Sequence, residues 1–228
     1  IGVAYLAFSN SRRSEQNRVW NGMAKETAHQ IGTPLSSLIG WTEILKIENV
    51  NPDYIVEIEK DVDRLKTITE RFSKIGSIPV LEKLDIIKET IESYDYLKTR
   101  SSKLIDFDLK IPEGEIPVDL NKQLYSWTIE NLVKNAIDAM KGRGKLTVEI
   151  SQLENDVKVS VSDTGKGIAK KDFNKIFEPG FTTKKRGWGL GLSLTKRIIH
   201  DFHNGKIKVL QSEKDKGSTI QISLKRAD

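Results

Sequence analysis

Residues 130–140 read ENLVKNAIDAM, and this stretch decides how the chain is interpreted. Its apolar residues recur every three or four positions, which predicts a helix with one face on a core. A second, polar face is formed at spacings i, i+1, i+4, i+5 and i+8 by Glu130, Asn131, Lys134, Asn135 and Asp138. Amide and carboxylate oxygens gathered in this way can hold a hard cation such as Mg²⁺ together with a polyphosphate. A solvated helix face is the simpler alternative, but asparagine is a weak helix former, and two asparagines four residues apart favour a site.

The helix that contains this stretch belongs to a mixed pattern of elements. Asn121 suits its N-cap, and Gly142 and Gly144 are expected to end it after Met140. The other predicted elements are helices over 85–98 and 191–202 and strands over 104–111, 145–152, 156–162, 206–212 and 218–225. Because strands and helices do not alternate strictly, the predicted fold class is α+β, with an α/β sandwich in which a mixed sheet lies under a layer of helices.

A glycine-containing stretch follows one of the predicted strands. Residues 163–167 read DTGKG. The glycines allow the backbone to approach a flat ligand closely, and the carboxylate of Asp163 can accept a hydrogen bond from an exocyclic amine. Aspartate and glycine also form ordinary turns, so this stretch alone is a weak signal.

A second glycine-rich stretch, residues 187–192, reads GWGLGL and leads into a predicted helix. Its backbone N–H groups can be presented to phosphate oxygens. Lys184, Lys185 and Arg186 come just before it and place positive charge on an expected lid. The sequence contains no GxxxxGK[ST] motif, and the glycine stretch does not lie in a βαβ unit with an acidic residue downstream.

The first third of the chain has a different pattern. Two apolar stripes with steps of three and four predict two helices separated by a break at Asn49, Asn51 and Pro52. The stripes consist of Ala24, Ala28, Ile31, Leu35, Leu38, Thr42 and Leu45, and of Ile55, Ile58, Val62, Leu65, Ile68, Phe72 and Ile75. The short connection predicts an antiparallel hairpin. One hairpin cannot bury both stripes well, so we expect a homodimer in which two copies form a four-helix bundle.

These patterns divide the chain into three parts. Residues 20–78 form the predicted hairpin, and residues 79–228 form the predicted α/β domain. Residues 1–19 begin with a mostly apolar segment, followed by Arg12 and Arg13. The apolar segment, Ile1 to Phe8, has eight residues and is too short to span a bilayer, which needs about 20. We expect this segment to be the inner end of a transmembrane helix, with the arginine pair on the cytoplasmic side. The alternative is an amphipathic start to the next helix.

The composition excludes several classes of site. The chain contains no cysteine, which rules out disulfides and thiolate metal sites. Its net charge of +5 is spread along the sequence. A nucleic-acid partner is not expected, because the sequence contains no basic stripe with base-reading elements.

The stretches described above resemble the ATPase superfamily of histidine kinases, gyrase and chaperones. They appear in the order of that superfamily and cover residues 119–228. The resemblance lies in the asparagine box 130–136, the first glycine box 163–167, the phenylalanine box 176–179 with 181–184, the second glycine box 187–192, and the closing strand signal 217–219. It implies that this region binds ATP with Mg²⁺.

The resemblance also implies roles for individual residues. Asn135 would coordinate Mg²⁺ with help from Asn131, Asp163 would accept from the adenine amino group, and Lys184 would reach the phosphates as the lid closes. The nucleotide-binding residues implied are Asn131, Lys134, Asn135, Asp138, Asp163, Gly165, Gly167, Thr183, Lys184, Gly187, Gly189, Leu190, Gly191, Leu192 and Thr219.

The hairpin indicates which branch of the superfamily is present. Residues 28–35 read AHQIGTPL and resemble the phosphoacceptor box of sensor histidine kinases. His29 lies one residue off the apolar stripe, whereas a core histidine would lie on it. A free imidazole, with a pKa of about 6.5, is largely neutral and nucleophilic near pH 7. The resemblance implies that His29 takes the γ-phosphoryl of ATP and passes it to an aspartate on a response regulator receiver domain. Thr33 would orient a water molecule that removes phosphate from that partner.

Gln30 departs from the family pattern, which commonly has glutamate or aspartate at this position. A neutral acceptor forms a hydrogen bond about half as strong as a charged one, so slower autophosphorylation is expected. One alternative is an ATP-binding phosphatase or scaffold module in which Gln30 disables the kinase. Another is a chaperone- or gyrase-type ATPase in which an acid such as Glu130 activates water and His29 has no role. The leading prediction is a sensor histidine kinase core on the cytoplasmic face of the inner membrane.

The other two histidines, His200 and His203, end a predicted helix before Gly205. Capping or solvation is the expected explanation for both.

Overall fold

The structure is a computed structural model that describes residues 28–48, 50–75, 79–184 and 189–227. The predicted membrane-proximal segment 1–19, the first eight residues of the predicted hairpin, and Gly187 lie outside these residues. The chain divides into two compact units, Ile1–Pro79 and Val80–Asp228, and each is described by itself.

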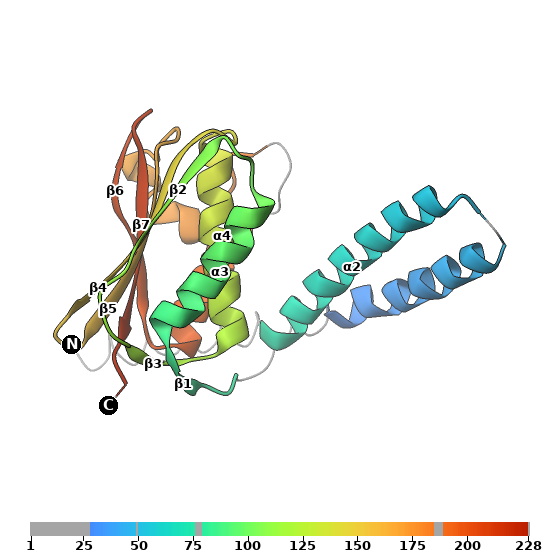
Figure 1. Cartoon of the computed structure of the whole chain (residues 1–228), viewed down its shortest axis with the longest axis horizontal. Helices are drawn as coiled ribbons and strands as arrows, with labels where there is room; N and C mark the ends of the chain where they lie inside the picture. Colours follow the sequence, from blue (N-terminus) through green and yellow to red (C-terminus); the bar gives the residue numbers. More distant parts are fainter. Residues whose placement is uncertain (1–27, 49, 76–78, 185–188, 228) are drawn as a thin grey trace, which may run out of the picture. The chain divides into compact units, whose positions relative to one another are not determined.

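The first unit contains a helical hairpin. One helix covers residues 28–47, and α2 (Pro52–Ile75) follows it (Figure 1). The turn is fixed at the start of α2, where the side chain of Asn51 accepts from the N–H of Asp53 at 3.0 Å and proline occupies the first helical position. Lys46 reaches Glu59 at 2.7 Å near the turn, and Gly32 faces Thr69 farther along the pair. The predicted antiparallel hairpin is therefore confirmed.

The apolar stripes of the hairpin are only partly buried. Leu35, Ile55 and Val62 lie between the two helices and are 6–8% exposed. Leu38 and Leu65, which belong to the same predicted stripes, remain 42% and 37% exposed. Other large apolar side chains exposed on the hairpin are Ile39, Trp41, Ile44, Ile47, Tyr54, Val56 and Ile58. A hairpin with this surface still has apolar area to bury.

The second unit is built on a five-stranded mixed sheet (Figure 1). The strands are β2 (Ile105–Lys110), β4 (Gly144–Leu153), β5 (Asp156–Asp163), β6 (Lys206–Glu213) and β7 (Gly217–Lys225). Their order is β2-β4-β5-β7-β6, with β2 parallel to β4 and the other pairs antiparallel. The register places Asp163 opposite Ser218, at the end of β5 and the start of β7.

Helices cover one face of this sheet. They are α3 (Ile86–Arg100), α4 (Lys122–Ala139) and α5 (Gly191–Arg197), the last of which continues as a π-helical turn (Ile198–Phe202). Side chains of α4 meet the alternating apolar residues of the sheet in one core. Fully buried members of this core are Tyr125, Ile129, Leu132, Val133, Leu146, Val148, Val157 and Val159. The predicted α/β sandwich with a mixed sheet under helices is confirmed.

Helix α4 begins at the predicted cap. The side chain of Asn121 accepts from the N–H of Leu124 at 3.1 Å, and it also donates to the carbonyl of Val80 at 3.0 Å. The N–H of Asn121 itself donates to Nε2 of His203 at 3.0 Å. The ring's Nδ1 donates to the carbonyl of Ile198 at 2.8 Å. His203 is buried, so solvation does not explain it; it joins the π-helical turn to the start of α4.

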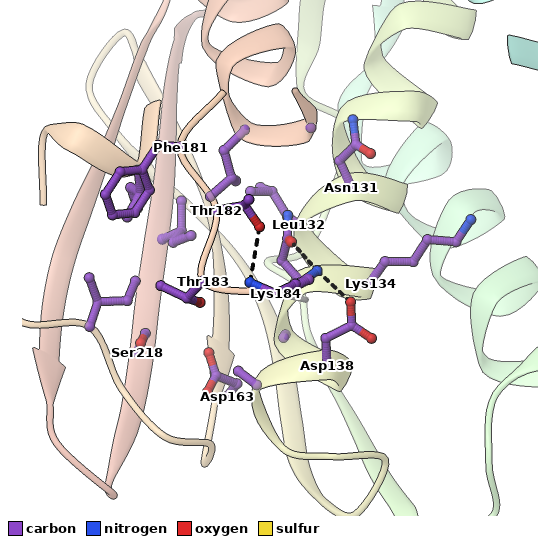
Figure 2. Close-up of a pocket in the computed structure, with 18 of the residues that line it drawn as sticks. Asn131, Leu132, Lys134, Asp138, Asp163, Phe181, Thr182, Thr183, Lys184 and Ser218 are labelled. Atoms are coloured by element: carbon purple, nitrogen blue, oxygen red, sulfur yellow. Dashed lines mark hydrogen bonds and ion pairs between the residues drawn. The ribbon is translucent and has the colours of Figure 1, made fainter. Parts of the chain in front are cut away.

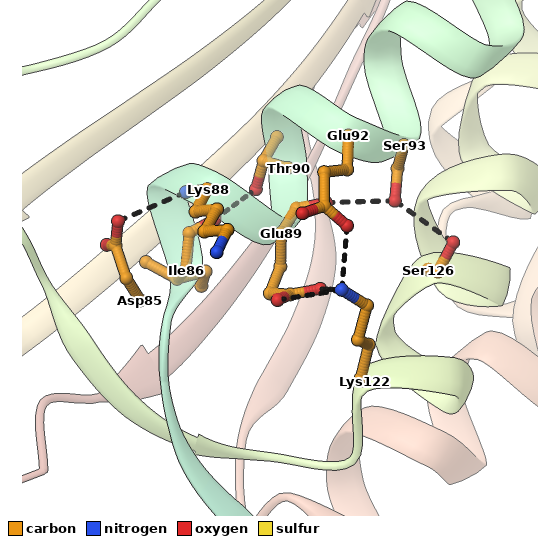
Figure 3. Close-up of polar contacts among 9 residues, drawn as sticks. All are labelled: Asp85, Ile86, Lys88, Glu89, Thr90, Glu92, Ser93, Lys122 and Ser126. Carbon is orange, nitrogen blue, oxygen red and sulfur yellow. Dashed lines mark hydrogen bonds and ion pairs between the residues drawn. The ribbon is translucent and has the colours of Figure 1, made fainter.

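A row of polar contacts fixes α4 against α3 (Figure 3). Lys122 lies 3.2 Å from the buried carboxylate of Glu89 and 2.7 Å from Glu92. Farther along, Ser93 donates to Ser126 at 3.0 Å. The hydroxyls of Thr90 and Tyr125 are 2.6 Å apart, and burial raises the pKa of Tyr125. Because buried polar groups are costly unless paired, these contacts restrict how the two helices can pack.

Two short strands were not predicted. β1 (Glu82–Asp85) and β3 (Pro117–Leu120) form a separate antiparallel pair with Glu82 opposite Leu120. Each has four residues, which is too short for an alternating pattern to stand out from a loop.

Among the described residues, no helix is both long enough and apolar enough to cross a membrane.

Candidate functional site

A cavity of about 620 Å³ opens in the second unit beside α4 (Figure 2). Its walls come from α4, the end of β5 with the loop that follows it, the start of β7, and the segments 181–184 and 189–192. The polar side chains that line it are Asn131, Lys134, Asn135, Asp138, Asp163, Lys166, Asp172, Thr182, Thr183, Lys184 and Ser218. The sequence stretches singled out above therefore meet around one space.

The α4 wall carries the polar face predicted for this helix. Asn131, Asn135 and Asp138 all border the cavity. Lys134 borders it too, and its ammonium pairs with Glu130 at 2.5 Å, one turn earlier. The Nδ2 atom of Asn131 is buried and has no hydrogen-bond partner within the part of the chain that the structure describes. This asparagine therefore retains a donor for a group that those residues do not supply.

The segment 182–184 contacts both sides of the cavity (Figure 2). The ammonium of Lys184 lies 2.5 Å from Oδ2 of Asp138 and 3.1 Å from Oδ1 of Asn135. On the other side, the ammonium of Lys166 donates to the hydroxyl of Thr183 at 2.9 Å. Two oxygens of α4 therefore converge on one cationic group.

Asp163 lies at the end of β5 and borders the cavity. Its Oδ1 accepts from the N–H of Gly165 at 2.7 Å, and the backbone N–H of Ser218 also favours the charged form of the carboxylate. Burial raises the pKa of Asp163 above its usual range, while the two N–H groups partly oppose that shift. A carboxylate has about four acceptor positions, so the hydrogen bond from Gly165 fixes its orientation and leaves other positions available.

Two glycines make this arrangement possible. Gly217 has φ +107°, and a Cβ there would lie 1.8 Å from the carbonyl oxygen of Asp163. A Cβ on Gly165 would lie 2.5 Å from the carbonyl carbon of Ala139. Only glycine lets β7 and the loop after β5 approach the residues around Asp163 this closely.

The predicted phosphoacceptor region is on the surface of the first unit. His29, Gln30 and Thr33 are exposed on the helix that covers residues 28–47. The hydroxyl of Thr33 donates to the carbonyl of His29 at 3.3 Å, so the two residues are one helical turn apart on the same side.

Comparison with known proteins identifies both units. Residues 20–78 match the family model of the His Kinase A (phospho-acceptor) domain. Residues 122–228 match the model of the histidine kinase-, DNA gyrase B-, and HSP90-like ATPase. The chain belongs to the histidine kinase family. This kinase is 32% identical over 223 residues to Sporulation kinase E of Bacillus subtilis (strain 168), a match that covers 93% of the chain and 29% of that protein. It is 31% identical to Sensor histidine kinase ZraS of Escherichia coli (strain K12), with 93% of the chain and 47% of that protein covered.

Solved structures give the same family. The catalytic domain of histidine kinase ThkA is 30% identical, with a TM-score of 0.59, and the match covers 65% of this kinase and 97% of that domain. ThkA in complex with the response regulator protein TrrA is 26% identical, with a TM-score of 0.63, covering 98% of this kinase and 66% of that chain. The kinase chain spans 29–51% of the length of the first curated relatives that it matches.

Most of the predicted nucleotide-binding residues border the cavity of the kinase. They are Asn131, Lys134, Asn135, Asp138, Asp163, Gly167, Thr183, Lys184, Gly189, Leu190, Gly191 and Leu192. Gly165 is not among the residues that line the cavity, and its N–H donates to Asp163. Thr219 differs from the prediction, because it is buried and bonds the hydroxyl of Ser162 at 2.9 Å. Side chains alternate along β7, so Ser218 faces the cavity and Thr219 points to the other face of the sheet.

Several residues that border the cavity were missed by the sequence analysis. Lys166 and Ser218 lie within the stretches 163–167 and 217–219, and the resemblance implies no role for either of them. Phe181 and Thr182 were quoted only as part of a motif. Asp172, in a short 3₁₀ helix (Lys170–Asp172), follows no motif. Its position could not be derived from spacing.

The residues present fit a nucleotide with one Mg²⁺. The cavity volume is within the range of about 300–1,000 Å³ that is typical of small-molecule sites. The described residues contain no group of three or more His, Cys, Asp or Glu that could hold a metal ion by themselves. Mg²⁺ bound with a nucleotide needs only one or two protein ligands, since phosphate and water complete its shell. Asn135 and Asp138 already direct two oxygens at one cation, the Lys184 ammonium.

Proposed function

We propose that this chain is the core of a sensor histidine kinase that phosphorylates His29 from Mg·ATP and then transfers the phosphoryl to an aspartate of a receiver domain. The observation that carries the proposal is the cavity of the second unit, with a fixed carboxylate at Asp163 and the cation-binding oxygens of Asn135 and Asp138 on its walls. The same chain presents an exposed histidine in a phosphoacceptor region.

The adenine end of the site would be defined by Asp163. One acceptor position of its carboxylate is used by the N–H of Gly165, and the remaining positions would accept from the exocyclic amine. Val161 and Ile220 border the same cavity and offer apolar contact for the flat base. Recognition of a base by one fixed acceptor distinguishes adenine from bases that carry a carbonyl at that place.

The phosphate end would be defined by α4 and the segment that follows Phe181. Bound Mg²⁺ supplies neutralisation of charge on the phosphate oxygens. Asn135 would hold the ion, and the unpartnered Nδ2 of Asn131 would donate to a phosphate or to water. The ammonium of Lys184 would leave Asp138 and reach the phosphates.

The chemistry at His29 is a substitution at phosphorus. A lone pair on one ring nitrogen attacks the γ-phosphorus, the bond to the bridging oxygen breaks, and ADP leaves. A carboxylate oxygen of the receiver aspartate then attacks the phosphohistidine and regenerates the imidazole. Positioning and charge neutralisation supply most of the catalysis in such transfers. The response regulator in the ThkA complex supports a receiver domain as the partner.

Gln30 and Thr33 would set the balance between kinase and phosphatase activity. Gln30 gives the imidazole of His29 a neutral neighbour in place of a carboxylate, which disfavours the charge that develops as the ring attacks. The hydroxyl of Thr33 donates to the helix backbone and keeps its lone pairs for a water molecule. The presence of Gln30 therefore also supports a second candidate, an ATP-binding phosphatase with little autokinase activity.

A second copy of this chain is the proposed partner of the hairpin. The exposed apolar side chains, with Leu38 and Trp41 among them, lie on helices whose stripes one hairpin buries only in part. A four-helix bundle of two hairpins would cover this surface. Attachment to the inner membrane through residues before the hairpin is a further part of the proposal.

The proposal is tested by incubating the chain with Mg·ATP labelled at the γ-phosphate, beside His29→Ala. We expect an acid-labile, base-stable label that is absent from the variant. ATP binding without label, combined with removal of phosphate from a phosphorylated receiver domain, would favour the phosphatase. Sustained ATP hydrolysis in His29→Ala would contradict both and indicate an ATPase.

A further inference from the structure

One hydroxyl in the second unit makes three short hydrogen bonds. Ser212, near the end of β6, accepts from the N–H of Ile168 at 2.7 Å. Its oxygen lies 3.0 Å from the carbonyl of Gly217 and 2.9 Å from the hydroxyl of Ser218. A serine hydroxyl has one donor and two acceptor positions. Donation to Gly217, with acceptance from Ile168 and Ser218, uses all three.

These bonds join the segments that hold Asp163. Its carboxylate accepts from the N–H of Gly165, in the loop that contains Ile168, and the backbone N–H of Ser218 favours its charged form. In the sheet, Ser218 lies opposite Asp163 on one side and opposite Ser212 on the other. Ile168 and Ser218 also border the cavity. Ser212 itself does not, so its influence on a ligand must pass through these neighbours.

The surrounding backbone leaves little room for another arrangement. A Cβ on Gly167 would lie 2.2 Å from the carbonyl oxygen of Glu213, the residue after Ser212. The N–H of Asp215 donates to the carbonyl of Lys166 at 3.0 Å, and the N–H of Lys166 donates to the carbonyl of Ala139 at 3.1 Å. These backbone bonds do not involve the hydroxyl. Loss of the Ser212 hydroxyl should therefore leave the fold in place and change the local alignment.

We propose that Ser212 is a positioning residue for recognition of the adenine amino group. By tying the loop after β5 to the start of β7, its hydroxyl holds the two N–H groups that orient the carboxylate of Asp163. This inference rests on the proposed ATP site and adds to it a residue outside the cavity. Without the hydroxyl, Asp163 keeps its charge but loses the orientation that suits the amine.

The test compares ATP with purine riboside 5′-triphosphate, which lacks the 6-amino group, by calorimetry in the presence of Mg²⁺. The wild-type chain should bind ATP more tightly. In Ser212→Ala, we expect the Kd for ATP to rise about tenfold while that for the purine analogue changes little. The ratio of the two Kd values isolates the contact with the amine. A general loss of structure would weaken the binding of both nucleotides together.

Three further variants sharpen the measurement. Ser212→Thr keeps a hydroxyl and should restore the wild-type ratio. Ser160→Ala removes another hydroxyl of the sheet, one that accepts from Gln221 at 3.1 Å, and should leave both Kd values unchanged. Ser212→Cys keeps the size of the side chain with much weaker hydrogen bonding and should lower the ratio. It decides the question if Ser212→Ala does not fold.

The outcomes separate the two proposals. The role of Ser212 alone would be overturned if the wild-type chain prefers ATP and the Ser212 variants keep this preference. The same holds if the variants weaken the binding of both nucleotides equally. A wild-type chain that binds neither triphosphate would overturn the proposed function, and this inference with it.

Discussion

Lys184 and Asp138 form an ion pair at the cavity of the second unit, with 2.5 Å between Nζ and Oδ2. The two residues are far apart in the sequence, and their contact connects the segment before the second glycine stretch to α4. The same ammonium donates to Asn135. A bound cation and the Lys184 ammonium would therefore compete for the same two oxygens.

Asp138→Asn should loosen the attachment of residues 182–184 to α4. The pair is exposed, and such pairs contribute at most about 1 kcal/mol, so a rise of up to about fivefold in tryptic cleavage after Lys184, Lys185 or Arg186 is expected. Quantitative mass spectrometry of the fragments measures the rate without nucleotide. Asp156→Asn breaks the exposed pair with Lys225 and is the matched control. Equal cleavage of the two variants would contradict the attachment.

Asp163→Asn should abolish most ATP binding without unfolding the second unit. The amide oxygen can still accept from Gly165, but the charged acceptor for the amine is lost, which should raise the Kd by about 10- to 100-fold. Calorimetric titration measures this change.

The same variant has a predicted pH signature in thermal unfolding without nucleotide. Burial raises the pKa of Asp163, so the folded protein binds its proton more readily than the unfolded chain does, and the ionised form costs stability. Asp163→Asn should therefore be relatively more stable near neutral pH. This gain should disappear as the pH falls to the ordinary pKa of 3.8 or below. A gain that does not depend on pH would show that burial of charge is not its cause.

His203 should make the second unit sensitive to mild acid. Burial lowers its pKa below the ordinary value of 6.5, and its Nε2 must remain unprotonated to accept from Asn121. The folded protein then binds fewer protons than the unfolded chain. The contribution of His203 to stability is thus complete above pH 6.5 and is lost as the pH falls through the lowered pKa.

His203→Gln tests this contribution by thermal unfolding across pH 5–8. The variant should lose about 1–2 kcal/mol at pH 8 and show a flatter pH dependence than the wild type. His200→Gln replaces a half-buried histidine of the same π-helical turn and is the matched control. The unfolding transition of the second unit is the one whose midpoint temperature shifts when an ATP analogue is added. Parallel curves for His203→Gln and wild type would contradict the prediction.

Gly217→Ala should destabilise the second unit by about 3 kcal/mol or more, because the added Cβ meets the backbone of Asp163 at a positive φ. Gly114→Ala offers a matched control, since Gly114 also has positive φ (+87°) and nothing lies within 4 Å of the added Cβ. Its cost should be about 1 kcal/mol. Thermal unfolding of the two variants separates the collision of the Cβ with the Asp163 backbone from the strain of a positive φ alone. Equal losses of stability would show that the backbone moves to relieve the collision.

Gln30→Glu should speed the labelling of His29 about five- to tenfold, because a charged acceptor stabilises the imidazolium character that develops during attack. Gln152→Glu adds the same charge on the second unit and should not change the rate. Initial rates of label incorporation at saturating Mg·ATP measure the effect. An unchanged rate in Gln30→Glu would show that this residue does not limit the reaction.

Much of the fold follows from the sequence, because the signals are local. The cap at Asn121, the polar face of α4 and the alternation in β4 and β5 each depend on neighbouring residues. The pair β1–β3 was missed because strands of four residues show too little periodicity. The split of the last helix into α5 and a π-helical turn has no local signal either.

The site was predictable at the level of stretches and less so at the level of atoms. The motifs predicted Asn135 and Asp163, which both border the cavity. They also predicted Thr219, but strand alternation turns its neighbour Ser218 toward the cavity instead. The pairing of Lys184 with Asp138 and the bonds of Ser212 depend on segments that are distant in the sequence. Such contacts are fixed by the packing of the whole unit.

The parallel pairing of β2 with β4 bears on the order in which the second unit folds. Ile105 pairs with Gly144, so the chain must return through β3 and α4 before this edge of the sheet can close. Contacts of high sequence separation require a long loop to be closed first and generally form slowly. The hairpins β4–β5 and β6–β7 have short connections and can assemble earlier, whereas the pairing of β5 with β7 also joins segments that are far apart in the sequence. Because α4 carries Asn131, Asn135 and Asp138, we expect these residues to reach their final positions late, so that an incompletely folded chain would not capture ATP.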